Sequence, residues 1–308
     1  MAGFDTITNH LSLILFSIGL DILLWFGPQL DLSKIIASLS SALSQTAQGQ
    51  PPQLADMVQT NFEAFQQIAV SFFYLSAWRL FPVGLSTLLA GGAPLENPIG
   101  AARQWQVASL GSSITIWLAL AALGLLVGTL YFSLVSQAAL AGKITVSTAV
   151  GKWLGRFGQV VLLSIFWIGL LLAISLPLSC ALLVFQSSGG LGNFVFFVYT
   201  ALILWLFFPL LFSPYGIFIH DDSMWASVLR GARLARLTMP VSLFFIIAVL
   251  ILSQGLDMLW SLPASNSWFT LVGVIGHAFI AAGLLAATFI FYRDAGIYVQ
   301  QRLQMLKT

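Results

Sequence analysis

The sequence contains very little charge. Only 7% of its 308 residues are Asp, Glu, Lys or Arg, whereas 59% are hydrophobic. Soluble globular domains carry about 25% charged residues, and a soluble fold as apolar as this one would expose patches large enough to aggregate. The mean hydropathy of +0.96 reflects the same excess of apolar residues. The composition therefore excludes a soluble domain and indicates that the lipid bilayer is the solvent of this chain.

Cysteine and catalytic motifs are equally scarce. Cys180 is the single cysteine and lies inside an apolar run, so one chain can form neither a disulfide nor a thiolate metal cluster. His10, His220 and His277 are too dispersed for an evident zinc site. The sequence has no Gly-x-Ser-x-Gly, His-Glu-x-x-His or P-loop motif. We therefore predict no catalytic residue, no metal site and no cofactor.

Long apolar runs dominate what is present. A helix needs about 20 apolar residues to cross roughly 30 Å of hydrocarbon. Because the runs are continuous rather than alternating, they predict helices and not a barrel. Five runs are long enough, and Leu11–Phe26, interrupted by Asp21, is a shorter sixth. We expect an all-α, polytopic transmembrane helical bundle of about six spans, with interfacial amphipathic helices. The five long runs are Ile114–Leu140, Val160–Phe185, Phe194–Ile219, Val241–Leu262 and Trp268–Tyr292.

Basic residues gather in the loops on one side of these runs. The loops Gln186–Asn193 and Pro263–Ser267 carry none. By the positive-inside rule the basic side is cytoplasmic, which places the C-terminal tail in the cytoplasm. The net charge of +2 therefore reflects membrane topology, and we expect no nucleic-acid partner. Nine of the twelve basic residues form three clusters: Lys143, Lys152 and Arg156; Arg230, Arg233 and Arg236; and Arg293, Arg302 and Lys307.

Five of these basic residues are candidates for contact with lipid headgroups at the membrane interface: Lys152, Arg156, Arg230, Arg233 and Arg236. One interpretation is that they bind an anionic lipid or a protein partner, with about 1 kcal/mol for each basic residue near an anionic surface. The other is that they only anchor the topology, which requires no ligand. The sequence favours anchoring.

The segment Asp31–Ser113 is harder to assign. Leu32–Leu43 and Leu54–Phe65 repeat apolar residues at helical spacing and predict two amphipathic helices. Ile68–Leu89 is apolar but contains Arg79, followed by a proline. If this run spans the membrane there are seven helices, and if it is interfacial or re-entrant there are six. Because an arginine at mid-span costs a few kcal/mol and proline breaks a helix, we favour six spans and an external cap.

The predicted organisation has four parts. They are a first span (1–30), an external amphipathic or re-entrant cap (31–113), a five-span bundle (114–292) and a basic cytoplasmic tail (293–308). The pattern Gly-x-x-Leu-x-Arg occurs at 151–156 and again at 231–236. The same offset superposes the units 114–185 and 194–262, which suggests a parallel repeat within the bundle.

Polar side chains within apolar runs are the strongest functional candidates, because the bilayer penalises them. They are Asp21, Arg79, Gln254, Asp257 and His277. Asp21 and Arg79 could neutralise each other. Asp257 and His277 lie at similar depths on the two helices of one hairpin, close enough for contact. One interpretation is a proton or ion relay through a water-filled cavity, and the favoured one is a set of polar clips between helices, typically worth about 0.6 kcal/mol each.

Small residues mark two helix faces. Gly124-x-x-x-Gly128 is one, and the row of Ala278, Ala282 and Ala286 is the other. Such faces let helices approach closely. Besides the lipid bilayer, the partners they suggest are another protein or a second copy of this chain.

Two stretches carry a resemblance to known proteins. Leu20-Asp21-Ile22-Leu23-Leu24-Trp25-x-Gly27-Pro28, followed later by Arg79-x-Phe81-Pro82-Val83-Gly84, resembles a family of bacterial multi-pass membrane proteins of uncharacterised activity. The stretch Ala226–Arg236 is similar to part of the membrane domain attached to some glycerophosphodiester phosphodiesterases. Their hydrolase part has no counterpart here, so their activity does not carry over. The resemblance implies a protein of the bacterial plasma (inner) membrane and implies no mechanism.

The sequence favours a non-enzymatic membrane scaffold or complex subunit, because no site chemistry is evident. The alternative is a transporter or permease for a small molecule or lipid that uses the intramembrane Asp, Arg and His residues. A membrane-embedded enzyme acting on lipids is a third possibility.

Overall fold

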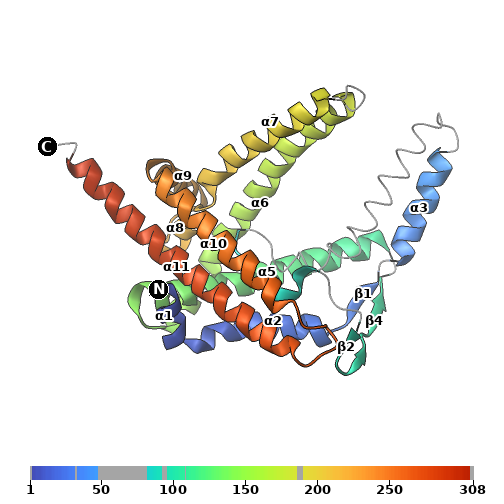
Figure 1. Cartoon of the computed structure of the whole chain (residues 1–308), viewed down its shortest axis with the longest axis horizontal. Coiled ribbons are helices and arrows are strands. Elements are labelled where there is room, and N and C mark those ends of the chain that lie inside the picture. Colours follow the sequence, from blue (N-terminus) through green and yellow to red (C-terminus); the bar gives the residue numbers. More distant parts are fainter. Residues whose placement is uncertain are drawn as a thin grey trace.

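Helices account for nearly all the regular structure. The computed structural model describes residues 2–31, 33–47, 82–91, 96–107, 109–185 and 190–305. The predicted all-α class is confirmed (Figure 1). In chain order the elements are α1 (Ala2–Asn9), the 3-10 helix η1 (Leu11–Ile14), α2 (Leu15–Phe26), β1 (Gln29–Asp31), α3 (Ser33–Ala47), η3 (Leu88–Gly91), β2 (Glu96–Asn97), β3 (Gly100–Ala101), β4 (Gln104–Gln106), α5 (Leu110–Ala141), α6 (Val146–Phe185), α7 (Gly190–Phe207), η5 (Phe208–Leu210), α8 (Tyr215–Ile219), α9 (Met224–Leu237), α10 (Met239–Trp260) and α11 (Thr270–Met305).

Each of the five long apolar runs lies in a helix, or a continuous helical segment, long enough to cross a membrane. In the described part of the chain these spans are Leu110–Ala141, Val146–Pro177, Phe194–Ile219, Met239–Trp260 and Thr270–Arg302. The sixth run behaves differently. α2 forms a sixth candidate span when it is taken together with α1, and the two helices are bent by 93° where they meet.

The ends of α5 follow directly from local sequence. Ser109 begins the helix with a capping box: its hydroxyl accepts the backbone N–H of Ser112, whose hydroxyl accepts the backbone N–H of Ser109. Gly142 ends the helix in the left-handed conformation at φ 64°, which glycine adopts without steric cost. The start and end of this span are therefore encoded by its flanking residues.

The core lies where α11 meets α1, α2 and α5. Phe132 on α5 and Phe289 on α11 form an edge-to-face pair with ring centroids 6.0 Å apart. On the neighbouring α8, the ring of Phe218 lies against both. Ala278, Ala282 and Ala286 of α11 are fully buried, which lets α1 and α5 approach closely. Aromatic rings and small residues thus share this core.

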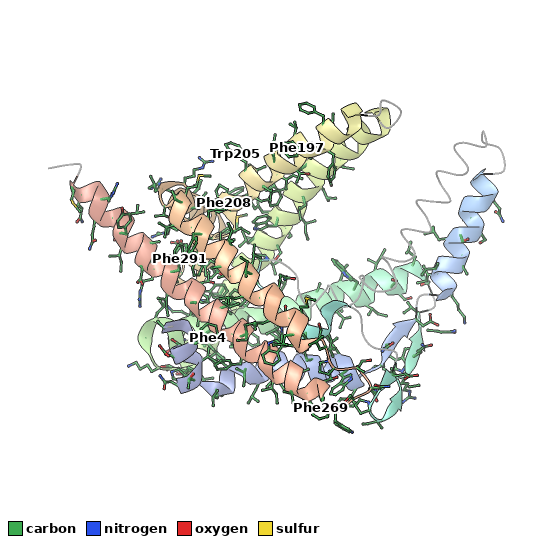
Figure 2. All side chains as sticks on the ribbon, in the orientation of Figure 1. Phe4, Phe197, Trp205, Phe208, Phe269 and Phe291 are labelled. Atoms are coloured by element: carbon green, nitrogen blue, oxygen red, sulfur yellow. The ribbon has the colours of Figure 1, made fainter. Side chains whose placement is uncertain are left out.

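The outer spans are far less buried than the core. α5 buries 56% of its most apolar window inside the chain and α11 buries 44%, whereas the span Phe194–Ile219, which begins in α7, buries none of its window and α10 buries 6%. The α6–α7 hairpin diverges from the α10–α11 hairpin (Figure 1). Along α7, Phe197 and Trp205 are 71% and 68% exposed (Figure 2). Within these two hairpins, α7 and α10 are the helices that present most of their apolar surface outwards.

A small strand-containing region lies beside the end of α2. β1 pairs in parallel with β4, and β2 pairs with β3 in a short antiparallel hairpin. The sequence predicted neither pair. The preceding segment, residues 82–91, enters the bundle, where Val83 and Leu85 are buried. Gly128 of α5 allows this entry, because a side chain there would place Cβ 2.6 Å from the carbonyl oxygen of Val83.

Part of the predicted cap lies outside the described residues. The first amphipathic stretch forms α3, as predicted. The second stretch, Leu54–Phe65, and residues 68–81 of the ambiguous run fall in the part that the structure does not describe. The choice between six and seven spans, and the four-part domain organisation, therefore stay predictions.

The two units of the suggested repeat differ locally at their linkers. In the first, residues 151–156 belong to α6, which continues without a break into the span. In the second, residues 231–236 belong to α9, which ends at Leu237, and Thr238 separates it from α10. The repeat also stays a prediction.

Candidate functional site

The intramembrane candidates that the structure describes meet at one end of the bundle, with a single exception. Asp21 from α2 and His277 from α11 bind residues within 86–89, and Asp257 from α10 binds His277. We call this group the polar junction: Asp21, Ser86, Thr87, Asp257 and His277. The exception is Gln254, which is exposed on α10. Sequence reasoning missed both hydroxyl residues, because a single Ser-Thr pair in a loop carries no distinctive signal.

His277 is bound on both sides of its ring. The imidazole is 2% exposed. Its Nδ1 lies 2.5 Å from Oδ1 of Asp257, and its Nε2 lies 2.9 Å from Oγ of Ser86. The contact between Asp257 and His277, expected from their depths, is therefore present. Through this one ring, α10 and α11 are joined to the segment 82–91.

Asp21 accepts the backbone N–H groups at the start of the short helix η3. It is fully buried. Its carboxylate accepts the hydroxyl of Thr87 and the backbone N–H groups of Leu88 and Leu89, each at 3.2 Å. Those N–H groups begin η3 and have no acceptor of their own within it. Arg79, the partner that the sequence suggested for Asp21, lies outside the described residues, so that pair stays a prediction.

The order of hydroxyl, imidazole and carboxylate in the junction invites comparison with a hydrolytic triad. A triad also requires donors aimed at the developing oxyanion. The N–H groups closest in sequence to Ser86 that the structure assigns, those of Leu88 and Leu89, already bind Asp21. Neither of the two cavities described below includes a junction residue. Within the described residues, these side chains join α2, α10 and α11 to residues 86–89 through polar contacts.

At the other end of the bundle, the first basic cluster forms an internal clamp. Lys152 Nζ lies 2.5 Å from Oδ2 of Asp221, and Arg156 reaches Oδ1 of Asp221 at 2.8 Å. Arg156 also donates to Ser133 Oγ and to the carbonyl of Phe218, at 3.1 and 3.2 Å. Its side chain is only 11% exposed. Lys152 and Arg156 therefore bind α6 to the loop after α8, and a cavity lies beside this clamp.

The clamp lowers the pKa of Asp221, which lies in the loop after α8. Burial raises the pKa of Asp221, but the hydrogen bonds and charges of Lys152 and Arg156 outweigh it, so its pKa lies below the usual value. The pKa of the neighbouring His220 shifts downwards, opposite to the shift of a histidine paired with a carboxylate. Burial and the charge of Arg230 lower its pKa, and Asp222 opposes them only in part. The pKa of His220 therefore lies below the ordinary histidine value.

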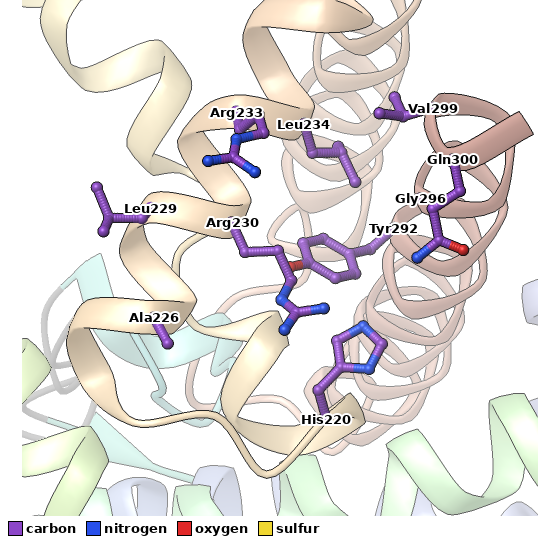
Figure 3. Close-up of a pocket in the computed structure, with 10 residues that line it drawn as sticks. All are labelled: His220, Ala226, Leu229, Arg230, Arg233, Leu234, Tyr292, Gly296, Val299 and Gln300. Atoms are coloured by element: carbon purple, nitrogen blue, oxygen red, sulfur yellow. The ribbon is translucent and has the colours of Figure 1, made fainter. Parts of the chain in front are cut away.

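The second basic cluster divides between a cavity and the open surface. Arg230 and Arg233 line a cavity between α9 and α11, together with His220, Tyr292 and Gln300 (Figure 3). Arg236 does not line it. The sequence indicated the arginines as candidates only because they are charged. It gave no signal for Tyr292 or Gln300, which lie in or after an otherwise ordinary apolar span.

Comparisons with known proteins add no relative. The sequence matches no protein-family model, and its comparison with curated proteins and with solved structures finds no match. The resemblance drawn from short motifs stays an expectation, and the function rests on the geometry described above.

Proposed function

We propose that this protein is a non-enzymatic scaffold or complex subunit of the bacterial inner membrane, with its C-terminal tail in the cytoplasm. The observation that carries the proposal is the uneven burial of its spans. α7 buries none of its apolar window and α10 buries 6%, against 56% for α5. Two of the five spans therefore have almost no fully buried residue in their apolar windows and offer much of their apolar surface to lipid or to the helices of a partner.

Packing within the chain supports assembly over transport. A transporter builds its substrate site at the interface between packed repeats, near mid-depth. Here α7 packs chiefly on α6, and α10 chiefly on α11. The exposed aromatic side chains of α7 include Phe194, Phe197 and Trp205. Large aromatic rings supply much of the contact area at protein interfaces, so α7 is the span best suited to a partner.

The small-residue faces are already used within the chain. Gly128 packs on the backbone of Val83, and Ala278, Ala282 and Ala286 are fully buried. A partner or second copy would therefore meet the exposed aliphatic and aromatic surface of α7 or α10.

A second candidate, transport of a small molecule or lipid, rests on the polar junction. Asp257, His277 and Ser86 form a continuous row of hydrogen bonds, and Asp21 lies next to it with Thr87. Such a row can pass protons. Transport predicts that Asp257→Asn abolishes flux in proteoliposomes while leaving any complex intact, whereas a scaffold predicts no flux to abolish.

Photo-crosslinking in native membranes tests the scaffold directly. A photoreactive phenylalanine analogue replaces Phe197, exposed on α7, and in a matched variant replaces Phe289, which is fully buried in the core. We expect a discrete protein adduct from position 197 and none from position 289. Native mass spectrometry of polymer-extracted membranes should then give an assembly heavier than the 33.4 kDa chain. A lone 33.4 kDa species with adducts to lipid alone would contradict the proposal.

Cysteine labelling tests the orientation. With Cys180→Ala as background, Lys34→Cys places a thiol on α3, where the side chain is exposed. Reaction with an impermeant reagent from outside supports six spans and an external cap. Protection from that reagent in intact cells, with reaction after lysis, would contradict this topology.

A further inference from the structure

A cavity of about 360 Å³ lies between α9 and α11, next to the loop after α8. Figure 3 shows Arg230, Arg233 and Leu234 on the α9 side, with Tyr292 and Gln300 opposite them on α11 and His220 below. The guanidinium groups and the amide are hydrogen-bond donors with a fixed or planar geometry. Donors from two helices and one loop therefore converge on one space.

The charge in this cavity is positive and only partly balanced. Arg230 Nε lies 2.8 Å from Oδ2 of Asp222, which lies outside the lining. Arg233 has no ion pair with a described residue. The cavity beside the clamp is different, because there Lys152 and Arg156 face Asp221 and Asp222. Of these two cavities, only the one between α9 and α11 holds an excess of cations.

A buried hydroxyl points to a ligand independently of the charges. Tyr292 is 1% exposed, and its hydroxyl finds no hydrogen-bond partner among the described residues. Its ring lines the cavity, and its hydroxyl end faces the side of Arg230 (Figure 3). Buried hydroxyl groups are nearly always satisfied, and each exception calls for an explanation. An oxyanion held by the arginines would supply the missing acceptor.

The apolar part of the lining indicates what carries that oxyanion. Leu229, Leu234 and Val299 complete the wall, and Leu229 is 65% exposed. Gly296, one turn after Tyr292, leaves the wall open on the α11 side, since its nearest neighbour beyond α11 is 3.9 Å from where a Cβ would lie. A headgroup phosphate fits the donors while its acyl chains follow the exposed Leu229.

We propose that this cavity binds one phosphate group, carried by an anionic phospholipid such as phosphatidylglycerol. Arginine suits phosphate because its planar fork donates two parallel hydrogen bonds. The site lies in the cytoplasmic leaflet if the proposed orientation holds. Binding in detergent does not depend on that orientation, so the two proposals fail separately.

Native mass spectrometry of the purified full-length chain in detergent measures the binding. The probes are short-chain phosphatidylglycerol, short-chain phosphatidylcholine and inorganic phosphate. We expect phosphatidylglycerol to bind most tightly, and Arg233→Ala to weaken it about tenfold, as expected for loss of a charge-assisted hydrogen-bond pair. Tyr292→Phe, which removes only the hydroxyl, should weaken it about threefold. Because Arg233 is exposed and unpaired among the described residues, its replacement leaves the fold intact.

Arg236→Ala is the matched control. It removes the same charge from an exposed position on the same helix, outside the cavity, and should change the affinity less than about twofold. Equal losses for Arg233→Ala and Arg236→Ala would overturn the proposal, because they would indicate unspecific attraction. Equal binding of phosphatidylcholine would overturn it as well. Competition by inorganic phosphate at equal concentration would instead assign the phosphate site to a free phosphate.

Discussion

The Nδ1 atom of His277 lies 2.5 Å from Oδ1 of Asp257, and the same ring contacts Oγ of Ser86 through Nε2. One imidazole therefore joins two neighbouring spans to the loop that enters the bundle. In lipid, where apolar surface gives helices no preference for one another, such polar contacts help to fix which helices pack together. The pair thus holds α10 and α11 together at one end of their hairpin.

Replacing this histidine should destabilise the fold. His277→Ala removes both contacts and leaves the Asp257 carboxylate and the Ser86 hydroxyl without their partner. We expect a loss of about 1–3 kcal/mol, the usual cost of leaving buried polar groups unsatisfied. Thermal unfolding in detergent micelles, followed by loss of helical circular dichroism, measures it.

Gln254→Ala serves as the matched control for that loss. Gln254 lies on α10 less than one turn before Asp257, but its side chain is exposed. Its replacement should change stability by less than about 0.5 kcal/mol. If both variants unfold at the same temperature as the unmodified chain, the junction contributes nothing to packing.

Asp21 should stabilise the fold by accepting hydrogen bonds through its carboxylate oxygens more than by its charge. Asp21→Leu leaves the N–H group of Leu88 without an acceptor, at a cost of about 1–3 kcal/mol, whereas the N–H group of Leu89 keeps the hydroxyl oxygen of Thr87. Asp21→Asn keeps one acceptor oxygen and should cost less. Hydrogen exchange of the peptide covering residues 82–91 should speed up in the leucine variant. Peptides from α9 provide the internal reference, and unchanged exchange in residues 82–91 would refute this role.

Much of the fold could be predicted because lipid imposes one strong rule. A continuous apolar run must become a helix, and each of the five long runs does so. The contact between Asp257 and His277 followed from hairpin geometry in the same way. Leu11–Phe26 was harder, since it is preceded by α1 and the two segments are bent by 93°. α1 packs closely on α11, where a side chain at Gly3 would meet the backbone of Gly283 and Ala287.

The site itself was less accessible to sequence reasoning. Ser86 and Thr87 acquire their importance from the entry of residues 82–91 into the bundle, which is a tertiary event. The basic residues looked alike in sequence, yet Arg156 is 11% exposed within an ion-pair clamp, whereas Arg233 lines a cavity. What separates them is the position of Asp221 and Asp222 relative to each cluster. Clusters of charged residues in the sequence do not show how far each cluster lies from these aspartates.

The close approach of residues 82–91 to α5 should depend on Gly128. A side chain there would place Cβ 2.6 Å from the carbonyl oxygen of Val83, so Gly128→Ala forces the loop or the helix to shift. We expect a loss of about 1–3 kcal/mol, as for other overpacked sites. Gly169→Ala in α6 is the control, since a Cβ there meets nothing within 4 Å. Equal thermal stability of the two variants would contradict the close approach.

The clamp around Asp221 should depend on pH in a definite direction. Lys152 and Arg156 hold the pKa of Asp221 below the usual value of an aspartate despite partial burial. A carboxyl whose folded pKa is depressed contributes stability above its unfolded pKa, and that contribution is lost as the pH falls through the folded pKa. Stability from the clamp should therefore be constant from about pH 5 upwards and should fall below about pH 4.

Asp221→Asn isolates this contribution and keeps the backbone unstrained. Asp221 has φ 56°, a conformation that asparagine tolerates well. The variant should be less stable at pH 7 and should lose less stability than the unmodified chain between pH 5 and pH 3. Arg156→Ala should destabilise more than Lys152→Ala, because the arginine is 11% exposed and the lysine 51%. Unfolding midpoints across this pH range measure both effects, and parallel curves for the unmodified chain and Asp221→Asn would show that the clamp does not titrate.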